Sequence, residues 1–95
     1  MSMPEIIGDK REQILALAKQ CGIYNVRVFG SVARGEVRPD SDADFVVDVE
    51  PGVSMGFVRL WADLEDLLGR KVDLLTERSL PPRMRERVVR DAVPL

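Results

Sequence analysis

Apolar residues recur at helical spacing in two segments of this chain, and a third segment is expected to be helical, with Pro82 near its start. In the first segment, Ile14, Leu17 and Ala18 form one stripe, and Gly22 is well placed to end the helix. In the second, Ser54 is a candidate N-cap and Gly69 a candidate C-cap. The segments that the pattern predicts as helices are 5–21, 54–68 and 83–92.

Apolar runs with strand character lie between these helices. They are "YNVRVFG" at 24–30, "DADFVVDV" at 42–49 and "KVDLLT" at 71–76. In the second run Phe45, Val47 and Val49 face one way, because successive residues of a strand point to opposite faces. The residues that face the other way are Asp42, Asp44, Val46 and Asp48. Residues 31–38 are polar and predict a short helical turn.

The order of these elements restricts the fold. The link between the second and third strands contains a long helix, which is usual for a right-handed parallel crossover. The link between the first two strands has only about a dozen residues, which suits an antiparallel pair. We therefore predict an α/β (α+β) fold, with a small mixed β-sheet of about three strands and helices mainly on one face. A single domain is expected over residues 1–95.

Charge and composition exclude several classes of protein. The net charge is −2 and the sequence pI is about 5.1, which argues against a general nucleic-acid binder. The chain has one cysteine, Cys21, and no histidine, so a His/Cys zinc site and a Ser-His-Asp triad are both excluded. No signal-peptide core and no apolar run of membrane length is found, so the cytoplasm is the expected location.

Three aspartates are the candidate catalytic and metal-binding residues of the chain. Asp42 and Asp44 begin the second predicted strand on one face, and Asp73 lies near the start of the third. If these strands are parallel neighbours, their amino ends lie side by side and the three carboxylates converge. Carboxylate oxygens suit a hard cation such as Mg²⁺, and two such ions clamp the attacking and leaving oxygens of an in-line displacement.

A Gly-Ser pair ends the first strand near the same site. Gly30 lets the backbone approach a phosphate, the Ser31 hydroxyl adds a donor, and amides at a helix start favour anions. Arg34 and Arg38 are near enough in the chain to pair with phosphate oxygens.

Each of these features also has an ordinary structural explanation. Gly-Ser before a helix is a common N-cap, and Asp73 can pair with Lys71 or Arg70. Asp48 lies farther along its strand and is interpreted as structural or solvent-facing, and Trp61 as a core residue. The arginine-rich stretch from Arg78 to Arg90 is either a solvated helix face or a docking surface for a partner or a phosphate.

Together the motifs resemble the signature of the polymerase β-like nucleotidyltransferase superfamily. "GSVARGEVRPDSDADFVV" has Gly-Ser, about ten residues, and then Asp-x-Asp, with an acidic residue on a later strand. The fuller pattern resembles the minimal nucleotidyltransferases. Its matching residues here are Gly30, Ser31, Ala33, Arg34, Gly35, Ser41, Asp42 and Asp44.

The resemblance implies a polymerase β-like fold and a magnesium-dependent enzyme that transfers AMP from ATP to a hydroxyl and releases pyrophosphate. It implies Asp42, Asp44 and Asp73 as catalytic and metal-binding residues, with two Mg²⁺ ions. It implies that Gly30, Ser31, Arg34 and Ser41 bind nucleotide phosphate. Proteins of this size in the family are antitoxins that modify a tyrosine of a helical HEPN-type partner, so a hetero-oligomer is expected.

Two alternatives stay open at this point. One is an antitoxin or binding subunit that neutralises its partner by forming a complex, with little catalysis. The other is the catalytic subunit of a two-component nucleotidyltransferase for small molecules. The intact carboxylates favour catalysis, because neutralisation by binding alone needs no carboxylate cluster.

Overall fold

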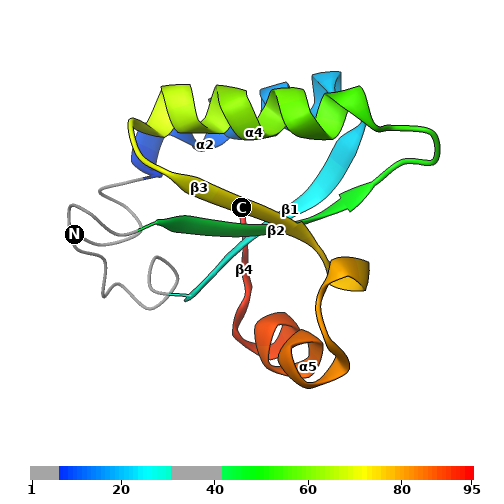
Figure 1. Ribbon diagram of the computed structural model, residues 1–95. Coiled ribbons are helices and arrows are strands. Elements are labelled where there is room, and N and C mark those ends of the chain that lie inside the picture. Colours follow the sequence, from blue (N-terminus) through cyan, green and yellow to red (C-terminus); the bar gives the residue numbers. More distant parts are fainter. Residues whose placement is uncertain (1–6, 31–41) are drawn as a thin grey trace.

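A mixed β-sheet forms the centre of the molecule (Figure 1). The computed structural model describes residues 7–30 and 42–95, and within them four strands follow the order β3-β2-β1-β4. β1 (Ile23–Phe29) runs antiparallel to β2 (Ala43–Val49), and β2 runs parallel to β3 (Val72–Thr76). Both strand directions predicted from the connections are confirmed, and so is the mixed α/β fold.

The fourth strand, β4 (Val93–Pro94), was not predicted. It pairs antiparallel with β1 opposite Arg27 and Val28, and the Leu95 N–H donates to the Val26 carbonyl oxygen at 3.0 Å. Two residues are too few to carry a period of two, so only the neighbouring strand makes them a strand.

Two helices, α2 (Arg11–Gln20) and α4 (Met55–Leu68), cover one face of the sheet (Figure 1). A 3₁₀ turn, η1 (Gly8–Lys10), precedes α2, so the described helix begins later than the predicted residue 5. Residues 5 and 6 of that prediction, and the whole predicted turn at 31–38, lie outside the described residues. Gly69 ends α4 with a φ of +64°, as predicted, while Ser54 occupies the N-cap position without a side-chain capping bond.

The main core lies between these helices and the sheet. Its most deeply buried large side chains come from both layers, and Trp61 packs against them as a core residue, as predicted. These buried residues include Ile14, Val28, Phe45, Leu60, Leu64, Val72 and Leu74. Their alternation along β2 and β3 places Asp44 and Asp73 on the opposite face of the sheet.

The opposite face carries a smaller apolar cluster under α5 (Pro82–Asp91), which follows the 3₁₀ turn η2 (Glu77–Ser79). Val46, Leu80 and Val88 are its buried members. Partly buried residues packed against it are Phe29, Leu75 and Ala92. Because Val46 is apolar on an otherwise acidic side of β2, it gives α5 a contact there, and helices cover parts of both faces (Figure 1). Among the described residues, no helix is long and apolar enough to span a bilayer.

Candidate active site

Asp44 and Asp73 are neighbours across the sheet. The parallel register pairs Asp44 of β2 with Asp73 of β3, and the antiparallel register pairs Asp44 with Phe29 of β1. Paired residues of adjacent strands direct their side chains to the same face, and neighbouring strands lie about 4.8 Å apart. Both aspartates are partly exposed. The predicted meeting of the amino ends of β2 and β3 is therefore present in the backbone.

Gly30 leaves room for the Asp44 carboxylate at the end of β1. Its φ is +71°, and a Cβ atom built on it would lie only 2.5 Å from Asp44 Oδ2. A side chain at this position would meet both a strained backbone conformation and a carboxylate oxygen. The glycine of the Gly-Ser motif and the second aspartate of the Asp-x-Asp motif are thus in direct proximity.

The remaining predicted residues of the site are only partly described. Asp42 is partly exposed and lies immediately before β2, two residues from Asp44, so strand alternation directs both to one side. The predicted phosphate-binding residues Ser31, Arg34 and Ser41 lie outside the described residues, as does Arg38.

The donors fit a hard cation that also binds substrate oxygens. Within residues 7–30 and 42–95, no three His, Cys, Asp or Glu side chains gather closely enough to hold a metal ion by themselves. The register brings two carboxylates, Asp44 and Asp73, to one face. Mg²⁺ commonly takes one or two protein carboxylates together with water and phosphate oxygens. The described structure therefore does not bring Asp42, Asp44 and Asp73 close enough together to share one ion, as the sequence predicted, and the role of each carboxylate stays a prediction.

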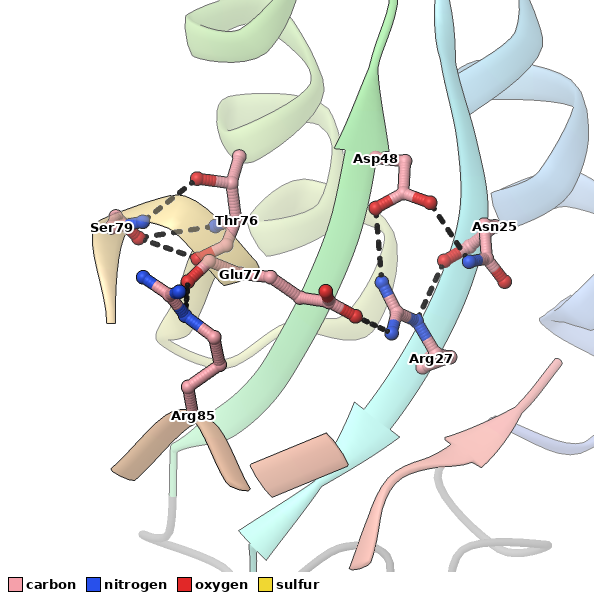
Figure 2. A network of polar contacts seen from close by, with 7 residues as sticks. All are labelled: Asn25, Arg27, Asp48, Thr76, Glu77, Ser79 and Arg85. Atoms are coloured by element: carbon pink, nitrogen blue, oxygen red, sulfur yellow. Dashed lines mark hydrogen bonds and ion pairs between the residues drawn. The ribbon is translucent and has the colours of Figure 1, made fainter. Parts of the chain in front are cut away.

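A separate polar network occupies the far end of the same sheet face (Figure 2). The Arg27 guanidinium donates to Glu77 Oε1 at 2.5 Å and to Asp48 Oδ1 at 3.2 Å. Its Nε–H donates to the Asn25 carbonyl oxygen at 3.1 Å, and the Asn25 side chain donates to Asp48 at 2.9 Å. The interpretation of Asp48 as structural is therefore confirmed, because its carboxylate accepts hydrogen bonds from Arg27 and Asn25 at this end of the strand.

Sequence reasoning missed the role of Arg27. With 8% of its surface exposed, it is the one buried charged residue in the described part of the chain. Two carboxylates offset the cost of burying its charge. An arginine between apolar residues of a predicted strand was the available signal, and its partners become neighbours only through the sheet.

The arginine-rich stretch divides into inner and outer members. Arg85 donates to the carbonyl oxygens of Glu77 and Leu80, at 2.8 and 3.2 Å, and so fastens α5 to η2. Arg83 and Arg87 instead line a hollow of about 200 Å³ with Met84 and Val88. Met84 and Val89 are exposed on α5, with 52% and 45% of their surfaces accessible.

Replacing Gly30 by alanine should damage the site more than the fold. The left-handed backbone at this position costs an L-residue about 1–2 kcal/mol, and the new methyl group would displace the Asp44 carboxylate. Since a displacement of about 1 Å can lower catalysis about a hundredfold, we expect a reaction that depends on the Asp44 carboxylate to slow by about that factor. Gly52, also at positive φ but with nothing within 4 Å of its Cβ position, provides the matched control Gly52→Ala. Equal activity of both variants would contradict the role of Gly30.

Comparison with known proteins agrees with this geometry. Residues 10–95 match the family described as "Nucleotidyltransferase domain". A protein adenylyltransferase MntA from Thermococcus cleftensis is 41% identical over 78 residues, which are 81% of this chain and 79% of that protein. A "putative protein adenylyltransferase" from Methanocaldococcus jannaschii is 35% identical over 88 residues, covering 92% of this chain and 95% of that protein.

Solved structures give the same fold. One described as a "putative minimal nucleotidyltransferase" superposes with a TM-score of 0.88 at 49% identity, covering 100% of this chain and 97% of that one. A toxin–antitoxin crystal structure with AMP-PNP contains a chain that superposes with a TM-score of 0.70 at 24% identity. That match covers 87% of this chain and 69% of the other, and at this identity it shows the likeness of the fold alone.

Proposed function

Because the chain belongs to the nucleotidyltransferase domain family, we propose that it transfers AMP from ATP to a hydroxyl group of a partner protein. The observation that carries the proposal is the row Phe29–Asp44–Asp73, with Gly30 closely packed beside Asp44. The relatives named protein adenylyltransferases support a protein hydroxyl as the acceptor. In this reaction the acceptor oxygen bonds to the α-phosphorus of ATP, and the bond to pyrophosphate breaks.

Each predicted residue then has a task in this reaction. Asp42 and Asp44 would hold Mg²⁺ together with the triphosphate, and the cation would neutralise charge on the phosphate oxygens. Asp73 lies across from Asp44 and orients the acceptor hydroxyl or takes its proton. The Gly30 backbone lies next to the triphosphate, and Ser31, Arg34 and Ser41 bind its oxygens.

The acceptor in this proposal is a tyrosine of a helical HEPN-type toxin, which the chain inactivates as its antitoxin. The name of the 41% identical relative supports an adenylyltransferase that acts on protein. A chain of a toxin–antitoxin structure has the same fold, and this likeness of fold supports the proposal that the chain pairs with a toxin. The two proteins would form a hetero-oligomer in the cytoplasm.

The decisive experiment combines this chain, labelled ATP, Mg²⁺ and the protein encoded beside its gene. We expect label on the neighbouring protein, and mass spectrometry should find one added AMP on a tyrosine. The variant Asp44→Asn serves as the control without transfer. Complex formation without label would favour neutralisation by binding alone, and label on a small alcohol or an aminoglycoside would favour a small-molecule enzyme.

Asp73→Asn should lower transfer about a hundredfold while it weakens ATP binding much less. A carboxylate near the acceptor hydroxyl acts mainly in the transition state, and such losses appear in kcat. Steady-state kinetics and calorimetric titration with ATP measure the two effects separately. A variant that binds ATP poorly yet turns over normally at saturation would make Asp73 a ground-state ligand instead.

Reversing two outer charges of α5, in the variant Arg83→Glu/Arg87→Glu, should weaken partner modification several-fold at low salt. Both side chains border the hollow beside the exposed Met84, where an acidic partner surface would pair with them. ATP binding should stay unchanged, because neither Arg83 nor Arg87 is among the predicted metal-binding and phosphate-binding residues. Unchanged modification at low salt would remove this surface from the proposal.

A further inference from the structure

Asp73 lies on a strand that the sheet supports from one side only. β2 has neighbours on both sides, so the backbone at Asp44 is held by both β1 and β3. β3 is at the edge of the described sheet and pairs with β2 alone. The outward N–H and C=O groups of an edge strand have no partner strand, so the strand separates from the sheet more easily unless side chains bind those groups. The two aspartates of the site therefore depend on different supports.

Two side chains of α4 cover the open side of β3 next to Asp73. The Trp61 indole N–H donates to the Val72 carbonyl oxygen at 2.5 Å, and Glu65 Oε2 accepts from the Val72 N–H at 3.1 Å. Trp61 and Glu65 are four residues apart, so they lie on the same face of the helix about one turn from each other. Both outward groups of Val72 are thereby bound to one helix.

The surroundings hold this pair of contacts in place. Phe57 meets the Trp61 ring edge to face, with centroids 6.0 Å apart at an interplanar angle of 89°. On the inner side of the strand, the Lys71 carbonyl oxygen accepts from the Ala43 N–H at 2.9 Å. The start of β3 is thus bound on both sides immediately before Asp73.

We infer that Trp61 and Glu65 are positioning residues for Asp73, because they set the place of the edge strand beside β2. The inference rests on the proposed function, in which Asp73 is the third carboxylate of the site. It extends that function to two residues of α4, the helix that packs on the face of the sheet opposite to Asp73. Since a displacement of about 1 Å can change a rate about a hundredfold, a looser Val72 should be visible in catalysis.

The test compares three variants of the full chain. Glu65→Leu removes the acceptor for the Val72 N–H at similar volume, whereas Glu65→Gln keeps an oxygen that can accept it. Trp61→Phe removes the indole donor and keeps an aromatic ring. Two quantities are measured: amide hydrogen exchange of Asp73 by NMR without nucleotide, and kcat and KM for AMP transfer to the partner protein.

Ser79→Ala is the matched control on the same strand edge. The Ser79 hydroxyl accepts from the Thr76 N–H at 3.2 Å and donates to the Thr76 carbonyl oxygen at 2.7 Å. It covers the far end of β3 by the same kind of bonds, away from Asp73. If Ser79→Ala and Glu65→Leu lose a comparable amount of melting temperature, a loss of kcat in Glu65→Leu alone is a local effect at Asp73 and not an effect of general stability.

We expect Glu65→Leu and Trp61→Phe to speed Asp73 exchange about tenfold and to lower kcat by a similar factor with little change in KM. Glu65→Gln should stay within about twofold of the natural chain, and Ser79→Ala should leave kcat unchanged. Unchanged Asp73 exchange in Glu65→Leu, or an equal loss of kcat in Ser79→Ala, would overturn the inference.

The failure of the proposed function is recognised separately. Normal transfer by Asp73→Asn would remove Asp73 from the proposed site, and the inference with it. A natural chain that transfers no AMP would refute the proposed function alone. In that case the exchange rates still decide whether Glu65 and Trp61 hold Asp73, because that measurement needs no acceptor.

Discussion

Asp44→Asn is expected to lower AMP transfer about a thousandfold or more and to leave the fold intact. The carboxylate lies in register with Asp73 and against Gly30, and the proposed function needs it as a charged ligand for the metal. Loss of several kcal/mol of charge stabilisation corresponds to at least about three powers of ten in rate. Asp42→Asn should have an effect of the same order, since both carboxylates belong to the Asp-x-Asp motif.

The melting temperature should stay the same or rise in Asp44→Asn. Like charges in register on neighbouring strands repel, and asparagine removes one of them at nearly equal volume. Transfer kinetics and thermal unfolding without metal measure the two parts of the prediction. Full activity in the variant, or a large loss of melting temperature without metal, would contradict the assignment.

Asp48→Asn is the control for that experiment. It lies on the same strand and the same face, but its carboxylate contacts Arg27 and Asn25 (Figure 2). We expect transfer within about threefold of the natural chain and a loss of about 1 kcal/mol in the free energy of unfolding, typical of one weakened charge-assisted hydrogen bond. The pair of variants therefore separates a catalytic carboxylate from a structural one.

Removal of divalent metal is expected to abolish transfer, and added Mg²⁺ should restore it. The physical reason is that Asp42, Asp44 and a triphosphate are all negative and need a cation to lie together. Transfer is measured in excess chelator and again after Mg²⁺ is returned. Undiminished transfer in the chelator would refute the metal requirement.

Thermal stability gives a second measure of the same requirement. A ligand at ten times its Kd stabilises the folded chain by about 1.4 kcal/mol, so Mg²⁺ with ATP should raise the melting temperature of the natural chain. Asp44→Asn should show a much smaller increase. An equal increase in both would place the bound metal away from Asp44.

Much of the fold follows from local patterns. Helical spacing and Gly69 predicted α4 to within one residue at its start, and alternation predicted which side of β2 faces the helices. Connection lengths predicted the directions of β1, β2 and β3. These features depend on periods and chain lengths that a single segment already contains.

The features that local patterns did not predict arise from contacts between segments that are distant in the sequence. β4 exists because β1 offers it an open edge, and α5 covers the far face because Val46 and Leu75 leave an apolar surface there. The role of Arg27 depends on Asp48 and Glu77, which come near it only in the folded sheet. None of these contacts produces a periodic pattern or a fixed spacing in the sequence from which it could be predicted.

The candidate site likewise has one part that the local sequence determines and one part that the tertiary structure determines. The sequence by itself determined the spacing of Gly30, Asp42 and Asp44, because strand alternation orients residues two apart without help from the rest of the chain. Only the tertiary structure decided that Asp73 lies beside Asp44. A slip of one residue in the pairing of β2 and β3 would turn Asp73 to the other face of the sheet. Burial of Val72 and Leu74 against α4 prevents that slip, and so the packing of the core determines where the third carboxylate lies.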